Sequence, residues 1–113
     1  MAEVRWSLTA EADLRAIEDF IAQDSVLHAV DLVDRLVEGV EHLSHAPRMG
    51  RVVPEFQRED LRELLFRAYR VVYQVRGEMV TVLRVVHAAR DLASLVRREP
   101  WVIEERWHEV LGR

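Results

Sequence analysis

Cysteine and lysine are both absent from this chain. Without cysteine, disulfides, zinc–thiolate sites and thiol catalysis are excluded. Without lysine, no side-chain amine can act as a Schiff base, a general base or a point-charge phosphate ligand, and all 16 basic residues are arginine. A run of about 18 apolar residues, which a membrane span requires, is also missing, and the first residues show no signal-peptide pattern. We therefore expect a cytoplasmic protein that does not associate with membranes.

The remaining composition is that of one globular domain. A chain of 113 residues with 50% apolar and 32% charged residues is long enough for one core. Its charge is unevenly distributed: residues 1–47 contain three arginines and ten acidic residues, whereas residues 61–98 contain eight arginines and three acidic residues. These segments have net charges of −7 and +5. Such a polarised molecule is suited to hold a polyanion or an acidic partner on its basic part.

The first residues predict a short strand followed by a helix. Apolar and polar residues alternate from Val4 to Leu8, which is typical of a strand with one buried face. Thr9 is a suitable N-cap for a helix over residues 10–22. Apolar residues recur along this segment at helical spacing, namely Ala10, Leu14, Ile17 and Ile21.

A second helix is predicted to begin at Asp24 or Ser25, either of which can cap it, and to end before Pro47. Its expected core face is an apolar stripe formed by Val26, Val30, Val33, Val37, Val40 and Leu43. Only a few residues separate the two helices, so we expect an antiparallel helical hairpin.

The second half of the chain predicts a loop and three strands. Residues 47–60 contain prolines and a glycine and are expected to form a loop. Its apolar residues Met49, Val52, Val53 and Phe56 are expected to pack against the core. Strands are predicted over 61–67, 70–76 and 79–86, with Gly77-Glu78 as a two-residue turn between the last two. The segment 79–86 is apolar on nearly both faces, which favours a central place in the sheet.

The element order predicts a β-α-α-β-β-β arrangement. This is an α+β fold in which the helical hairpin packs on one face of a mainly antiparallel sheet. Residues 91–98 predict a further short helix. Residues 99–113 predict an amphipathic helical tail that belongs to the same domain as residues 1–98. In that tail we expect Trp101 and Trp107 to be buried.

Three segments follow this predicted hairpin in a fixed order: Pro47–Arg51 (PRMGR), Tyr69–Val75 (YRVVYQV) and Val82–Asp91 (VLRVVHAARD). Together with the element order, they make residues 3–95 resemble the RelE/ParE toxins of type II toxin–antitoxin systems. The resemblance implies a growth inhibitor that is neutralised by a cognate antitoxin and needs no cofactor. Within this family one fold serves two activities. RelE-like members cut messenger RNA on the ribosome, and ParE-like members poison DNA gyrase.

Three residues are candidates for RNA cleavage if the chain is RelE-like. A metal-free site needs cations that stabilise the pentavalent phosphate, together with an acid and a base. Arg70 and Arg90 match family arginines that contact phosphate, and His87 has a side chain suited to acid–base catalysis. Alternatively, His87 holds its loop in shape through a bond to a strand-end carbonyl or to Asp91.

Other positions depart from the RelE-like pattern. Leu61 and Glu63 occupy the positions of two family lysines, and Val96 occupies the position of a family tyrosine. A net charge of −4 is also poorly suited to ribosome binding. We therefore favour a ParE-like gyrase inhibitor, which is not an enzyme. The alternatives are a RelE-like ribosome-dependent endoribonuclease and a non-toxic family member that acts as a binding module.

The remaining arginines of the basic segment are candidates for partner contacts. We expect Arg62, Arg67 and Arg84 to bind the antitoxin or the target, unless they only balance the acidic first half. His42 and His45 have a spacing that can bind metal, but they are better explained as a solvated helix end, so no metal site is expected. The assemblies that we consider are a homodimer and a toxin–antitoxin heterotetramer.

Overall fold

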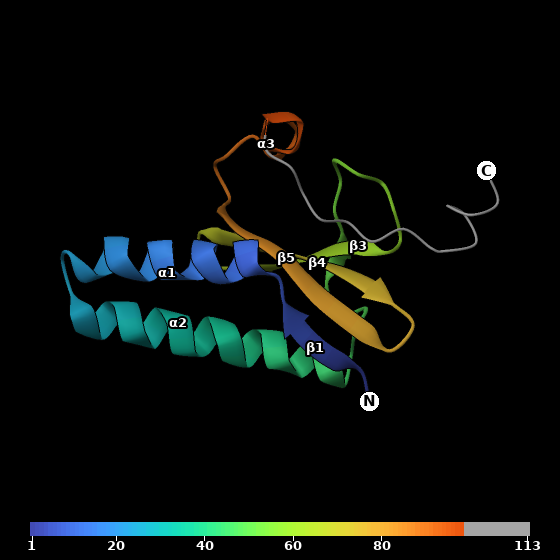
Figure 1. Ribbon diagram of the computed structural model, residues 1–113, viewed down its shortest axis with the longest axis horizontal. Helices are drawn as coiled ribbons and strands as arrows, with labels where there is room; N and C mark the ends of the chain where they lie inside the picture. Colours follow the sequence, from blue (N-terminus) through green and yellow to red (C-terminus); the bar gives the residue numbers. More distant parts are fainter. Residues whose placement is uncertain (99–113) are drawn as a thin grey trace.

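The computed structural model describes residues 1–98, and the predicted tail with Trp101 and Trp107 lies outside the described residues (Figure 1). The elements follow the predicted order, with one additional short strand, β2. They are β1 (Glu3–Trp6), α1 (Leu8–Ala22), α2 (Val26–Glu41), the 3-10 turn η1 (His42–Ser44), β2 (Arg51–Val52), β3 (Leu61–Phe66), β4 (Tyr69–Arg76), β5 (Met79–His87) and α3 (Leu92–Arg98).

The strands form one sheet in the order β1-β5-β4-β3-β2. Strand β1 is parallel to β5 and the other neighbours are antiparallel, which confirms the mainly antiparallel sheet. Strand β5 lies between β1 and β4, which confirms that it is not at the edge of the sheet, as its two apolar faces predicted. The β4–β5 turn has Gly77 at a φ of +56°, a conformation that glycine adopts without steric cost, which confirms the predicted turn.

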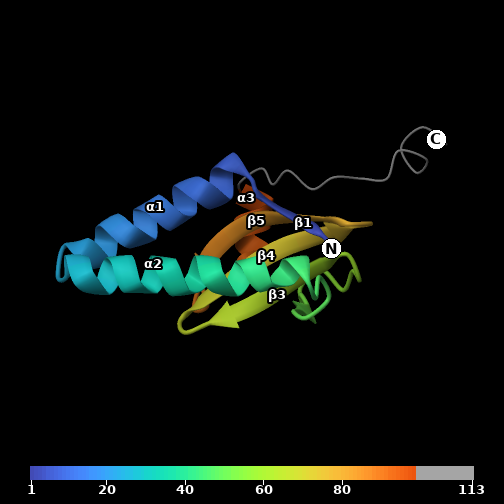
Figure 2. The same cartoon turned by 90° about the horizontal axis from the view of Figure 1, so that it is seen from below.

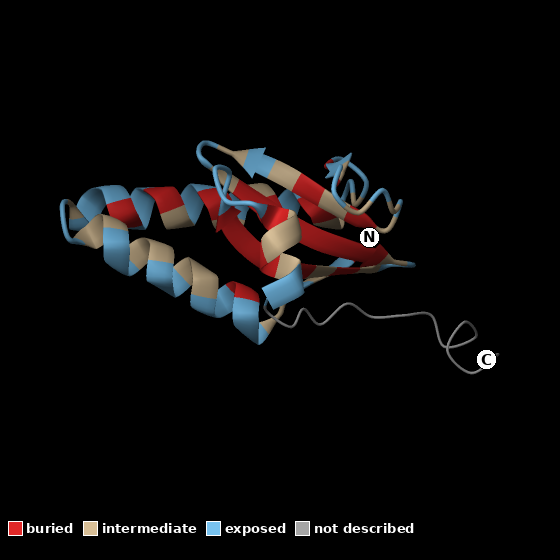
Figure 3. Cartoon of the chain, turned by 90° about the horizontal axis from the view of Figure 1, so that it is seen from above, coloured by how far each residue is buried: buried red, intermediate tan, exposed pale blue. Residues whose placement is uncertain are grey.

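Helices cover both faces of this sheet. The α1–α2 hairpin packs on one face, seen from its own side in Figure 2, and α3 lies over the other face (Figure 1). The core under the hairpin includes Leu36, Val40, Leu43, Val71, Tyr73, Val75, Val80, Val82 and Val85. The smaller core under α3 consists of Val53, Val72, Val86, Leu92 and Leu95. Figure 3 shows the buried strands that lie beneath α3.

The chain turns from β1 into α1 at Ser7, two residues earlier than predicted. The Ser7 hydroxyl donates to the Leu83 carbonyl and accepts from the Ala10 N–H, both at 3.0 Å. Ser7 is therefore the N-cap, and the prediction of Thr9 as the cap was wrong. Because the helix has already begun, Leu8 is not on a buried strand face but 84% exposed.

Helix α2 is capped by Ser25, as predicted. Of its predicted core stripe, only the end is buried, namely Val40 and, in η1, Leu43. The hydroxyl of Ser25 accepts from the His28 N–H at 3.2 Å. The helix buries Ala29, Leu32, Leu36 and Val40. By contrast, Val26 and Val30 are exposed, and Val33 and Val37 are half-buried. Leu32 and Leu36 precede Val33 and Val37 by one residue, which is about 100° around a helix. The apolar arc of α2 is thus wider than its contact with the sheet.

A single tyrosine holds the start of the 47–60 loop. The Tyr73 hydroxyl is buried, donates to the Pro47 carbonyl at 2.8 Å and accepts from the Gly50 N–H at 2.9 Å. A Cβ atom at Gly50 would lie 2.5 Å from the Glu63 carbonyl oxygen, so this close approach requires glycine. In the same loop, Val53 and Phe56 pack against the core as predicted, whereas Met49 is exposed.

Candidate functional site

Four charged side chains meet on the face of the sheet that α3 partly covers. Arg70 is the second residue of β4, and Glu63 lies within β3, where it is paired with Arg51 of β2. The Arg70 Nε donates to Glu63 Oε1 at 2.6 Å, and its Nη1 and Nη2 donate to the two Glu55 oxygens at 2.9 and 2.7 Å. Arg51 Nε donates to the remaining Glu63 oxygen at 2.6 Å. We call Arg51, Glu55, Glu63 and Arg70 the buried charge network.

This network is electrically balanced, and its centre is buried. The Glu63 side chain is 0% exposed and that of Arg70 is 9% exposed. At its edge, the side chains of Glu55 and Arg51 are 29% and 55% exposed. Glu55 accepts two hydrogen bonds from Arg70, which lowers the Glu55 pKa and raises the Arg70 pKa relative to their ordinary values. Two cations face two anions, and every nitrogen of the Arg70 guanidinium is bonded to a carboxylate. The network therefore fixes the loop that contains Glu55 onto the sheet.

Arg84, a predicted partner-binding residue, is also buried in an ion pair. Its Nε and Nη2 donate to the two Asp13 oxygens at 2.8 and 3.0 Å. The same carboxylate accepts from the backbone N–H of Val85 at 2.9 Å. The pairing of β1 with β5 ends at Val82. Beyond that point, Asp13 accepts the backbone hydrogen bond that the edge of β5 would otherwise lack. The pair attaches α1 to the sheet.

The other two predicted partner-binding arginines differ in exposure. Arg62 donates to the Gly50 carbonyl at 2.9 Å and to the Glu59 carboxylate at 2.7 Å, so it fastens the 47–60 loop. Arg67 lies in the β3–β4 turn at a φ of +51°. Its side chain is 54% exposed and 3.8 Å from Asp31. Of these three arginines, Arg67 is the one that a partner reaches most easily.

The structure separates Arg70 from His87, two of the three residues that the sequence suggested for RNA cleavage. Tyr69 pairs with His87 and Arg70 pairs with Val86, so His87 and Arg70 are on opposite faces of the sheet. The His87 ring contacts Tyr69 edge-on, with ring centroids 5.6 Å apart. Its Nδ1 accepts from the Ala89 N–H at 3.1 Å. His87 thus holds its loop through that N–H, rather than through a strand-end carbonyl or Asp91.

Arg90 follows β5 in the same loop and is exposed. Within residues 1–98 its side chain forms no hydrogen bond or ion pair, while its backbone N–H donates to the His87 carbonyl at 3.0 Å. Arg90 and His87 therefore share one solvent-facing loop at the end of β5.

Residues 1–98 contain no group of three or more His, Asp or Glu side chains placed to hold a metal ion. Over the same range, every helix is too short or too polar to cross a bilayer.

Comparison with known proteins agrees with this architecture. Residues 4–92 match the family model of the ParE toxin of type II toxin–antitoxin systems, parDE. The chain belongs to the ParE toxin family. It is therefore a type II toxin, and its family implies a cognate antitoxin as partner.

This toxin matches two relatives over nearly the whole length of each. A protein of Caulobacter vibrioides named Toxin RelE2 is 38% identical over 91 residues, which are 80% of this toxin and 99% of that protein. A solved structure described as the chromosomal ParDE TA system from P. aeruginosa matches with a TM-score of 0.65 and 28% identity. The match covers 77% of this toxin and 96% of that chain.

Proposed function

We propose that this toxin stops growth by binding DNA gyrase and that it does not cut RNA. The observation that carries the proposal is the buried charge network. Arg70, the residue matched to a phosphate-binding arginine of RelE-like nucleases, has all of its guanidinium nitrogens bonded to Glu55 and Glu63. Glu63 itself occupies the position of a lysine in those nucleases.

The chemistry of RNA cleavage supports this reading. A pentavalent phosphate gains stability from cations whose N–H groups are free to turn toward it. To reach a phosphate, Arg70 would have to leave Glu63, and removing one partner of a buried ion pair costs about 3–5 kcal/mol. A phosphate brought to the same face would also meet the two carboxylates. A toxin that acts by binding does not require a cationic centre at this place.

A RelE-like nuclease remains the second candidate because of one exposed loop. His87 and Arg90 lie together there, and the Caulobacter vibrioides relative is named Toxin RelE2. In this alternative His87 is the acid or base and Arg90 contacts the phosphate. In the preferred function, two of the exposed cations of the basic segment, Arg67 and Arg90, are contacts for an acidic segment of the antitoxin or for the target.

Growth assays with His87→Asn separate the two candidates. Asparagine can keep a hydrogen-bond acceptor for the Ala89 N–H but cannot transfer protons near neutral pH. A gyrase-binding toxin should arrest growth as strongly with this variant as without it. The nuclease alternative requires loss of toxicity and, for the unchanged protein, codon-phased cuts in ribosome-bound messenger RNA by primer extension. Such cuts would refute the proposal, and normal growth at verified soluble levels of the unchanged protein would favour a non-toxic binding module.

A further inference from the structure

Helix α3 packs on one half of its face of the sheet. Its buried residues Leu92 and Leu95 belong to one cluster with Val53, Val72 and Val86. Because side chains alternate along a strand, register places further residues of β1, β4 and β5 on the same face, toward the β4–β5 turn. They are Glu3, Arg5, Gln74, Arg76, Met79 and Thr81, and we call them the turn-side half of the α3 face.

Arginine dominates the charge on and around the turn-side half. Arg5 and Arg76 belong to it, and the neighbouring loop adds Arg58, which donates to Asp60 at 2.8 Å. That carboxylate also accepts from the Gln74 side chain at 2.8 Å, so the ion pair lies against this face. The last turn of α3 ends in two further arginines, both exposed. These five arginines outnumber the acidic side chains among them, Asp60 and the glutamate of β1, so the local charge is positive.

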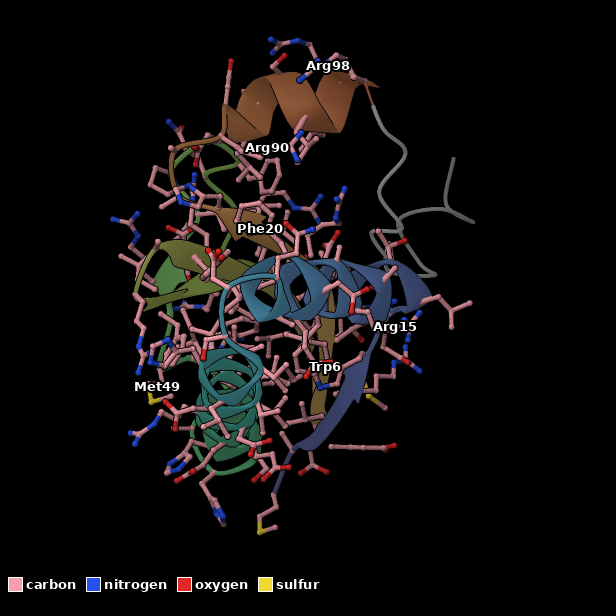
Figure 4. The ribbon with its side chains drawn as sticks, turned by 90° about the vertical axis from the view of Figure 1, so that its left-hand side faces the viewer. Trp6, Arg15, Phe20, Met49, Arg90 and Arg98 are labelled. Atoms are coloured by element: carbon pink, nitrogen blue, oxygen red, sulfur yellow. The ribbon has the colours of Figure 1, made fainter. Side chains whose placement is uncertain are left out.

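Residues 99–113 continue the chain from this side of the sheet. Arg98, the last residue of α3, lies across the sheet from the helical hairpin (Figure 4). The segment that follows is outside the described residues and also beyond residues 4–92, which match the ParE toxin family. Its sequence contains four acidic residues and two arginines, together with Trp101 and Trp107. Its net charge is therefore opposite in sign to that of the turn-side half.

The length of this segment also fits the turn-side half. As a helix, its 15 residues would extend about 22 Å, at roughly 1.5 Å per residue. Along β4, Val72 lies beneath α3 and Arg76 is the last residue, which is about 13 Å of strand. The segment is thus long enough to cross the whole turn-side half.

We propose that residues 99–113 bind back across the turn-side half of the α3 face. Their acidic side chains meet its arginines, and their tryptophans pack on the half-buried Met79 and on Phe56 of the neighbouring loop. An acidic segment of a partner would match the same charge, but a segment attached to α3 has an effective concentration of the order of millimolar. Residues 99–113 therefore compete with other acidic chains for these arginines, whichever target the toxin has.

A fluorescent label on the turn-side half tests the proposal. The chain has no cysteine, so Thr81→Cys can be labelled selectively with bimane, a fluorophore that tryptophan quenches on contact. We expect the bimane emission to rise about twofold when Trp101 and Trp107 are both replaced with phenylalanine. Met79→Cys provides a second labelling position on the same half if Thr81→Cys folds poorly. Asp34→Cys, at an exposed position of α2, is the control, and its emission should not change.

Two charge reversals test the role of the arginines. Arg76→Glu acts on the turn-side half, and Arg15→Glu makes the same change on α1, on the hairpin side of the molecule (Figure 4). With the label at Thr81→Cys, the first reversal should raise the bimane emission and the second should leave it unchanged. Equal effects of the two reversals would overturn the proposal.

Three further outcomes would also overturn it. One is an emission at Thr81→Cys that does not depend on the two tryptophans, and another is an equal change at Asp34→Cys. The third comes from mixing labelled chains that lack both tryptophans with an excess of unlabelled chains. Quenching in that mixture would show that a second copy supplies the segment.

Discussion

Replacing Glu63 with glutamine tests the buried charge network most sharply. The substitution keeps the size of the side chain but removes the charge that Arg51 and Arg70 share. Since the Glu63 side chain is 0% exposed, water cannot replace the lost carboxylate. Removing one partner from a buried ion pair costs about 3–5 kcal/mol, and we expect the lower end because glutamine retains one acceptor oxygen. A domain of this size has a total stability of about 5–15 kcal/mol.

The assay is urea unfolding followed by circular dichroism, with a thermal melt beside it. A loss of about 3 kcal/mol corresponds to a fall in Tm of roughly 10 °C for a domain of this length. Asp31→Asn is the matched control, because it removes a 50% exposed carboxylate that accepts a hydrogen bond from Arg35 at 2.9 Å. Its effect on stability should be small, because water screens an exposed ion pair. Equal, small losses for both variants would refute the reasoning that the network holds the 47–60 loop on the sheet.

Three further predictions concern the 47–60 loop, one of them with a control substitution in α2. Tyr73→Phe leaves a buried carbonyl and N–H of the loop unpaired, so the free energy of unfolding in urea should fall by about 2 kcal/mol; an unchanged midpoint would contradict this. Gly50→Ala places a methyl group 2.5 Å from a backbone oxygen and should destabilise strongly, whereas Gly39→Ala, with nothing within 4 Å, should stabilise α2 by up to about 1 kcal/mol. Glu55 has a lowered pKa in the folded state, so its stabilisation is present at neutral pH and is lost as the pH falls below 4.5, the ordinary value. In Glu55→Gln the free energy of unfolding should therefore fall less steeply as the pH is lowered below 4.5. An unchanged pH dependence would count against the Glu55–Arg70 ion pair.

Much of the fold could be predicted from the periodicity of apolar residues and from turn residues. Strict alternation identified β4, and a glycine before an apolar run identified the β4–β5 turn. The buried face of α2 could not be predicted in this way. Leucines and valines occupy neighbouring stripes of that helix, and hydropathy does not distinguish them. Which side chains are buried depends on the elements packed against the helix.

The candidate site was harder to predict because its charges pair over long sequence distances. Asp13 is 71 positions from Arg84, and Glu55 is 15 positions from Arg70. No local pattern connects such residues, so the arginines of the basic segment could be read as free cations. One signal was present in the sequence. Glu63 interrupts an apolar strand, and an acid buried at such a position requires cationic partners.

The supercoiling reaction of purified DNA gyrase tests the central claim most directly. We predict that the purified toxin inhibits supercoiling in proportion to its concentration, that His87→Asn inhibits equally well, and that the cognate antitoxin restores the reaction. Full supercoiling at toxin concentrations that arrest growth in cells would contradict the account.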